Sequence, residues 1–225
     1  MFNINDKYCQ FLAEDMCIDL EHLKIKIESQ EISSSAPLIC QSIEILCNYV
    51  GKKTKEDVNN YCVPVLEAMT GEPYIVMDSI RMAFFRFISG GMKELFEHQE
   101  NEVWFPKIIL KIKLEPNDIE LLDDELIIYR GCDISEFELR KFGQSWSTCE
   151  NVARRFAYEH YCSQPWFLAE NRVVVRATYQ KSNVLYANQA ENSEYEIAVD
   201  PIKLVNIEII TSQNNQANGA KSPHA

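Results

Sequence analysis

Three short segments in the second half of the chain carry side chains suited to chemistry on a nucleotide. They are Tyr129-Arg130-Gly131, Ser145-Trp146-Ser147-Thr148 and Glu194-Tyr195-Glu196. A planar guanidinium binds phosphate oxygens and sugar hydroxyls through paired hydrogen bonds. A carboxylate held beside a sugar stabilises the positive charge that develops on the ring when a glycosidic bond breaks. An arginine, a hydroxyl and a pair of carboxylates therefore predict a site that grips a dinucleotide and breaks its glycosidic bond.

The residues around these segments indicate β-strands. After Pro106 the chain contains short runs rich in β-branched residues, which predict strands at residues 107–114, 126–130, 172–179, 183–187, 195–199 and 203–210. The segment that contains Ser147 is a further strand. One helix is expected between them, with its start near Cys149 and with Val152 and Phe156 facing the core. These strands and this helix must position the three segments.

The first 100 residues have the apolar spacing of helices. Hydrophobic residues recur every three or four positions over residues 12–27, 39–50 and 80–88. Thr54 with Asp57 resembles a capping box, and Asp78 with Ser79 is expected to cap the last of these runs, which Gly90 ends.

The expected fold class is therefore α+β, with N-terminal helices followed by a mostly antiparallel β-sheet that has one embedded helix. Residues 1–100 are expected to form a helical region, and residues 101–211 the catalytic core. The tail, residues 212–225, is rich in Asn, Gln, Ser and Gly and is expected to be disordered.

The charge of the chain is strongly acidic, with a formal net charge of -12. Tight, non-specific binding to a phosphate backbone needs a basic surface, so the composition argues against it. Residues before Pro106 include 9 basic and 17 acidic side chains, and the remainder 13 and 17. The acidity is concentrated in the helical half, where a basic partner surface would dock.

The cysteines and the apolar runs indicate an intracellular protein. None of the eight cysteines forms a Cys-x-x-Cys pair, so they are expected to be reduced thiols rather than metal ligands or disulfides. Apolar runs are broken by charge well short of the roughly 20 residues that a membrane span needs. No cationic, apolar leader opens the sequence. We expect a soluble, cytoplasmic protein, or one delivered into a target cell without a cleavable signal peptide.

Taken together, the three segments and the helix at residues 151–157 resemble the arginine-serine-glutamate branch of the mono-ADP-ribosyltransferases, a group with many bacterial toxins and effectors. The resemblance covers roughly residues 105 to 210. It depends on four features in order: the strand that ends in Tyr129-Arg130-Gly131, the strand with Ser147, the helix, and the strand that opens with Glu194-Tyr195-Glu196. Cys149 and Ser145 depart from the family pattern, since a hydroxyl residue and an aromatic residue are common at their positions.

The resemblance implies a role for each residue of the site. Glu196 is the catalytic carboxylate, and Arg130 grips NAD. Gly131 brings its backbone close enough to bond the nicotinamide amide, and Ser147 holds Glu196 and the nicotinamide ribose with Thr148 in support.

Glu194 is the residue expected to choose the acceptor. If its strand is regular, Glu194 and Glu196 project from the same face. In families with this Glu-x-Glu spacing, the first acid lies in a loop that meets the acceptor, and it usually accompanies transfer to arginine. A carboxylate at that place orients a guanidinium and helps to remove its proton. The loop at residues 188–193 is then the element that reads the acceptor.

These roles imply transfer of ADP-ribose from NAD to a macromolecule, most simply to a protein arginine, with NAD as the substrate and no metal. One alternative is transfer to an RNA or DNA base by a toxin of a toxin-antitoxin or phage-defence system, with a local basic groove near Arg154, Arg155, Arg172 and Arg176. A second is an inactive binding module. The helical half covers one side of the NAD cleft or, before about residue 55, forms a cap for an antitoxin or regulatory protein.

Overall fold

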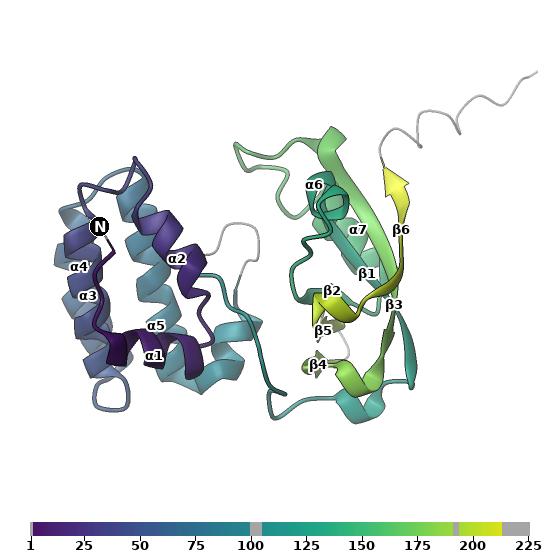
Figure 1. Ribbon diagram of the computed structural model, residues 1–225, viewed down its shortest axis with the longest axis horizontal. Helices are drawn as coiled ribbons and strands as arrows, with labels where there is room; N and C mark the ends of the chain where they lie inside the picture. The colour runs from purple at the N-terminus through teal and green to yellow at the C-terminus, as the bar shows by residue number, and fades with distance from the viewer. Residues whose placement is uncertain (1, 100–104, 191–193, 213–225) are drawn as a thin grey trace, which may run out of the picture. The chain divides into compact units, whose positions relative to one another are not determined.

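The computed structural model describes residues 2–99, 105–190 and 194–212 (Figure 1). The chain divides into two compact units, Met1–Lys111 and Ile112–Ala225. The division follows Lys111, whereas the sequence predicted a change of architecture near residue 100. Of the predicted disordered tail, only Ser212 is described, and it ends a strand. Residues 213–225 lie outside the described residues.

The N-terminal unit consists of helices. They are α1 (Asp6–Glu14), α2 (Leu20–Ile27), α3 (Ala36–Tyr49), α4 (Lys55–Glu67) and α5 (Glu72–Glu97). Side chains cap several of them, because the first backbone N–H groups of a helix have no partner within it. The capping box predicted at α4 is confirmed: Thr54 accepts from the Asp57 backbone, and the Asp57 carboxylate accepts from the Thr54 backbone.

Two details of the predicted helices are wrong. The apolar run over residues 12–27 forms two helices rather than one, because Cys17 has a left-handed φ of 51° and Ile18 forms a bridge with Ile108. Asp78 and Ser79 do not cap a helix but lie inside α5, which begins at Glu72. The helical backbone of α5 is interrupted at Gly90-Gly91, where the sequence predicted the end of the run.

The strand predicted at residues 107–114 is absent from the structure. Within the described residues 105–114, the only sheet-like feature is the bridge from Ile108 to Ile18. Ile108 and Leu110 are both 3% exposed. The Lys107 carbonyl accepts from the Asp19 backbone N–H at 2.9 Å. Ile108 and Leu110 are therefore buried in the helical unit, whereas Ile112, the next residue of the alternation, is exposed.

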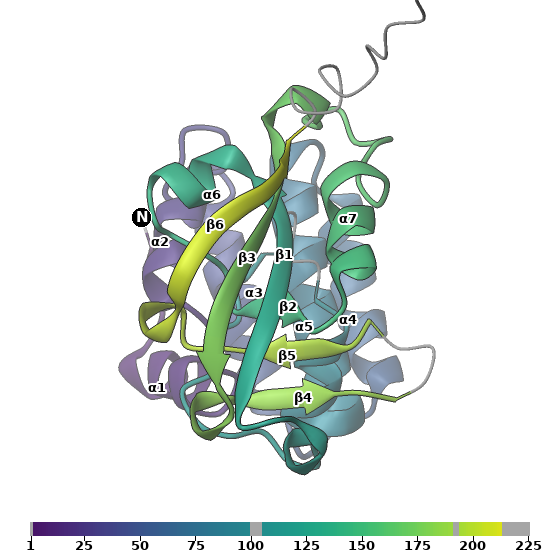
Figure 2. The same cartoon turned by 90° about the vertical axis from the view of Figure 1, so that its right-hand side faces the viewer.

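The C-terminal unit is built on a six-stranded antiparallel sheet with the order β4-β5-β2-β1-β3-β6. Its strands are β1 (Glu125–Asp133), β2 (Ser145–Ser147), β3 (Arg172–Gln180), β4 (Tyr186–Asn188), β5 (Glu196–Ala198) and β6 (Val205–Ser212). Figure 2 shows the long strands β1, β3 and β6 side by side, with the short strands β4 and β5 running across them. Short 3-10 turns lie at η1 (Ile119–Leu121), η2 (Ala169–Asn171), η3 (Lys181–Asn183) and η4 (Pro201–Lys203). The predicted α+β class is confirmed.

The described residues of this unit include two helices, where the sequence predicted one. The predicted helix is α7 (Glu150–Tyr158), and the additional one is α6 (Ile134–Glu138). Adjacent strand residues face opposite sides of a sheet. Val175 of β3 packs in a core that also contacts Ile134 and Phe137 of α6, whereas Val174 packs on Ala153 and Ala157 of α7. The two helices therefore cover opposite faces of the sheet.

No helix within the described parts of the chain is both long enough and apolar enough to span a bilayer.

Candidate functional site

The three predicted segments lie on three neighbouring strands. Arg130 is on β1, Ser147 on β2 and Glu196 on β5, and the strand order runs β5-β2-β1. Ser147 is the register partner of Glu196 on one side and of Tyr129 on the other. Side chains of residues directly opposite one another project from the same face of a sheet. The Ser147 hydroxyl and the Glu196 carboxylate therefore share one face.

Arg130 projects from the other face. It alternates with Tyr129 along β1 and shares its side of the strand with Ile128 and Cys132, which belong to the main core. Tyr129 instead packs with residues of α7. The backbone alternation thus directs the Arg130 and Glu196 side chains to different faces of the sheet.

The Arg130 side chain is buried, with 8% of it exposed, and it holds several elements together. Its Nε and Nη2 donate to the two carboxylate oxygens of Glu136 at 3.0 Å each, and its Nη1 donates to the Ser145 carbonyl at 2.7 Å. The same carboxylate accepts from the Gly143 backbone N–H at 3.1 Å. This two-pronged ion pair links α6, the start of β2 and the end of β1. Glu136 was not predicted, since an acid six residues after a strand arginine has no distinctive pattern.

Gly131 has a structural reason to be glycine. A Cβ at this position would lie 2.1 Å from the Ala153 carbonyl oxygen and 2.4 Å from the Ala157 backbone nitrogen. Helix α7 therefore approaches β1 at a distance that only glycine permits. The absence of a side chain at Gly131 is explained by this packing, whatever its backbone also binds.

Ser147 uses its hydroxyl to fix backbone on two sides. Its Oγ donates to the Glu194 carbonyl at 2.7 Å and accepts from the Cys149 backbone N–H at 3.0 Å. The side chain is 5% exposed. Ser147 thus joins Glu194, two residues before β5, to the start of α7, where Cys149 is the N-cap residue. The neighbouring serine differs, because the buried Oγ of Ser145 has no hydrogen-bond partner among the described residues.

Thr148 joins the two ends of the connection between β4 and β5. Its backbone N–H donates to the Tyr195 carbonyl at 3.0 Å, and its Oγ1 donates to Gln189 Oε1 at 2.8 Å. The Gln189 Nε2 donates to the Glu196 carbonyl at 3.2 Å, and the Gln189 backbone N–H donates to the Asp118 carboxylate at 2.8 Å. The sequence pointed to the segment that contains Gln189 but not to this side chain.

The expected regular strand through Glu194 and Glu196 does not form. Strand β5 begins at Glu196, and Tyr195 has a left-handed φ of 48°. The side-by-side arrangement derived from an even spacing therefore does not apply. Glu194 is exposed before the strand, and Glu196 is half-buried at its start. Residues 191–193 of the predicted acceptor loop lie outside the described residues.

The arginines considered for a nucleic-acid groove are largely engaged. Arg154 pairs with Glu150 within α7, and Arg176 pairs with Glu208 across β3 and β6. Arg172 is 2% exposed, and its Nε donates to the Ala157 carbonyl at 3.2 Å, near the end of α7. These contacts give three of the four side chains partners within the unit.

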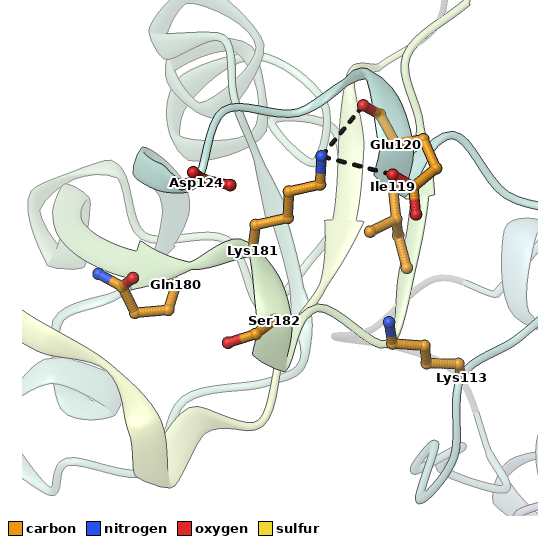
Figure 3. A pocket seen from close by; sticks show the side chains of 7 residues that line it. All are labelled: Lys113, Ile119, Glu120, Asp124, Gln180, Lys181 and Ser182. Atoms are coloured by element: carbon orange, nitrogen blue, oxygen red, sulfur yellow. Dashed lines mark hydrogen bonds and ion pairs between the residues drawn. The ribbon is translucent and has the colours of Figure 1, made fainter.

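A surface pocket of about 380 Å³ lies at the other end of β1 and β3 (Figure 3). It is lined by Lys113, Ile119, Glu120, Asp124, Gln180, Lys181 and Ser182. The Lys181 Nζ donates to the Glu120 carbonyl at 3.1 Å and lies 3.7 Å from its carboxylate. The lining has both signs of charge and includes none of the predicted site residues.

Comparison of the chain with protein-family models, with curated proteins and with solved structures gave no match.

Proposed function

We propose that the C-terminal unit is a mono-ADP-ribosyltransferase, which transfers ADP-ribose from NAD to a macromolecular acceptor and releases nicotinamide. One observation supports this most: Ser147 stands in register between Tyr129 and Glu196. Three segments that are separate in the sequence thus occupy adjacent strands. We also propose that the six-stranded sheet is of the ADP-ribosyltransferase type.

In the proposed reaction, the bond between the ribose C1′ and the nicotinamide nitrogen breaks, and nicotinamide leaves with the bonding electron pair. The Glu196 carboxylate stabilises the resulting positive charge on the ribose. An acceptor nucleophile then forms a bond to C1′ and loses its proton. Ser147 supports Glu196 through its bond to the Glu194 carbonyl, which fixes the backbone just before the catalytic residue.

NAD binding is assigned to Arg130, Gly131, Ser147 and Thr148. The Arg130 fork already holds a carboxylate, Glu136, in the two-pronged geometry that also suits a phosphate. Glu136 therefore orients the guanidinium, and NAD binding either shares or displaces this contact. The chemistry needs no metal, because the charge that develops is met by a carboxylate.

The proposed acceptor is a protein arginine. The Glu194 carboxylate is exposed next to the proposed catalytic residue, where it is able to meet a guanidinium from another molecule. Transfer to nucleic acid is less favoured, since Arg154, Arg172 and Arg176 have partners within the unit and the chain is acidic overall. Binding of an antitoxin or regulatory protein to the helical unit and a cytoplasmic location stay predictions.

The acceptor is tested by incubating the protein with labelled NAD and a cell lysate and separating protein from nucleic acid. We expect label in protein with the wild type and none with Glu194→Ala, which keeps slow NAD hydrolysis. Label in RNA or DNA would show that the acceptor is nucleic acid rather than protein. Full transfer by Glu194→Ala would contradict the proposal that the acceptor is an arginine. Glu208→Ala is the matched control, because Glu208 is an exposed acid on a strand remote from β5 in the sheet order.

A further inference from the structure

Gln189 forms hydrogen bonds through both its side chain and its backbone. It follows β4 directly, and its side chain is half-buried. The amide oxygen accepts from Thr148 Oγ1 at 2.8 Å. The amide nitrogen donates to the carbonyls of Asn188 at 3.1 Å and Glu196 at 3.2 Å. The side chain therefore needs both an acceptor and a donor, which only an amide supplies at this length.

The backbone of Gln189 is held as well. Its N–H donates to the Asp118 carboxylate at 2.8 Å, and the Asp118 N–H donates to the Ala187 carbonyl at 2.9 Å. Asp118 precedes the η1 turn, so the end of β4 is fixed to a separate part of the unit. Gln189 thus has little freedom to move, and it transmits this constraint to the Glu196 carbonyl.

Both ends of the connection from β4 to β5 are tied to β2 or to the residue after it. Gln189 at the outgoing end is held by Thr148 Oγ1. At the returning end, the Tyr195 carbonyl is held by the Thr148 N–H and the Glu194 carbonyl by Ser147 Oγ. The left-handed φ of 48° at Tyr195 turns the chain between the two glutamates. These hydrogen bonds therefore contribute to the relative placement of Glu194 and Glu196.

We propose that Gln189 is a positioning residue that sets Glu194 relative to Glu196, and that it thereby controls how much ADP-ribose goes to the acceptor rather than to water. The inference rests on the proposed function. Gln189 acts through the backbone of its neighbours and is not a catalytic residue. Loss of the amide leaves the Glu196 carbonyl and the Thr148 hydroxyl without these partners, which favours rearrangement of the connection.

The variant Gln189→Leu removes both the donor and the acceptor, whereas Gln189→Glu keeps the acceptor and removes the donor. The exposed Gln180, which donates to Glu125 at 3.1 Å near the far end of the sheet, gives the matched control Gln180→Leu. The experiment measures three rates or constants for each protein: transfer to acceptor in a lysate, NAD hydrolysis, and KM for NAD. Far-ultraviolet circular dichroism checks that each variant is folded.

We expect Gln189→Leu to lower the ratio of transfer to hydrolysis by roughly tenfold or more, with KM for NAD within about twofold of wild type. Gln189→Glu should show the same direction, because the bond to the Glu196 carbonyl is lost in both. Gln180→Leu should keep the wild-type ratio. A wild-type ratio in Gln189→Leu, or an equal fall of transfer and hydrolysis, would overturn the positioning role while leaving the transferase proposal intact.

Hydrogen exchange of backbone amides supplies a readout that does not depend on activity. In Gln189→Leu we expect faster exchange at the Thr148 N–H, which donates to the Tyr195 carbonyl, and unchanged exchange along β3. Unchanged exchange at Thr148 would overturn the structural part of the inference. If the wild type and Glu196→Gln both left NAD intact in the lysate, the proposed function would fail, and with it the functional part of the inference.

Discussion

Ser147 lies directly opposite Glu196 across the antiparallel pair of β2 and β5, and its hydroxyl binds the backbone two residues before that glutamate. The contact at 2.7 Å joins the proposed NAD-binding serine to the carbonyl of Glu194. A single side chain therefore connects β2 with the backbone of the first acid, two residues before the second. Any change at Ser147 is expected to disturb the acids as well as its own contact with substrate.

Replacing Ser147 should harm both stability and turnover. Ser147→Ala removes the partners of the Glu194 carbonyl and the Cys149 N–H, which should lower the free energy of unfolding by about 1–3 kcal/mol. We expect NAD cleavage to fall by roughly tenfold or more. Urea unfolding and a nicotinamide assay measure the two effects.

Ser145→Ala is the matched control, because the buried Ser145 Oγ has no hydrogen-bond partner in the part of the chain that the structure describes. It should keep wild-type stability within about 0.5 kcal/mol. A larger effect on turnover from Ser145→Ala than from Ser147→Ala would reverse the assignment of the two serines.

The buried pair of Arg130 and Glu136 should contribute to stability separately from NAD binding. Glu136→Gln leaves a buried guanidinium without its carboxylate and is expected to lower the free energy of unfolding by about 3–5 kcal/mol. Arg130→Lys keeps the charge but loses the two-pronged contact. If Arg130 also grips NAD, Arg130→Lys should raise KM for NAD more than Glu136→Gln does. Equal KM values for NAD in the two variants would contradict the proposal that Arg130 binds NAD and would leave it a structural role only.

Gly131→Ala should destabilise the unit through a clash with α7. The added methyl would meet backbone atoms of Ala153 and Ala157 at 2.1 and 2.4 Å, and backbone cannot rotate away as a flexible side chain does. We expect a loss of about 1–3 kcal/mol or more in the free energy of unfolding. Ile127→Ala, at an exposed position of the same strand, is the control. A neutral Gly131→Ala would show that α7 packs less closely on β1 than described.

Two thiols of the helical unit, the buried Cys62 and the partly exposed Cys47, should make the protein less stable at high pH. Burial raises the pKa of Cys62 from 9.0 to about 11 and that of Cys47, which also has Glu44 nearby, to about 12. The unfolded chain releases these protons at lower pH than the folded chain. Their contribution to stability is therefore fully present below about pH 9 and is lost as the pH rises through 11 to 12.

Urea unfolding at pH 8 and pH 10.5 measures this effect. The loss of stability between the two pH values should be smaller in Cys62→Ala than in the wild type. It should be unchanged in Cys162→Ala, because Cys162 is exposed. An identical loss in Cys62→Ala and the wild type would contradict the linkage.

The elements that the sequence predicted well are specified locally. The capping box at Thr54 and helix α7 each depend on a few adjacent residues with distinct preferences. The strand that was wrongly predicted at residues 107–114 is not specified locally. Ile108 and Leu110 alternate as in a strand, but what they pack against is decided by tertiary contacts with the helical unit.

The residues of the candidate site also fall into those that the sequence predicted and those that it missed. Arg130, Ser147 and Glu196 were found because their types and order match a pattern, and the register of β1, β2 and β5 brings their segments together. Glu136 and Gln189 were missed because their roles depend on contacts with residues that no local pattern links to them. The left-handed turn at Tyr195, which separates the two glutamates, carries no glycine to mark it.

Release of free nicotinamide tests the central claim most directly, because every acceptor of ADP-ribose, including water, requires that bond to break. The assay compares the wild type, Glu196→Gln and Gln180→Leu in a lysate that supplies acceptors, with NAD in excess. We predict release by the wild type and by Gln180→Leu, and a loss of roughly a hundredfold or more in Glu196→Gln with its folding intact. Equal release by the wild type and Glu196→Gln, or no release above the lysate background by any of the three, would contradict the account.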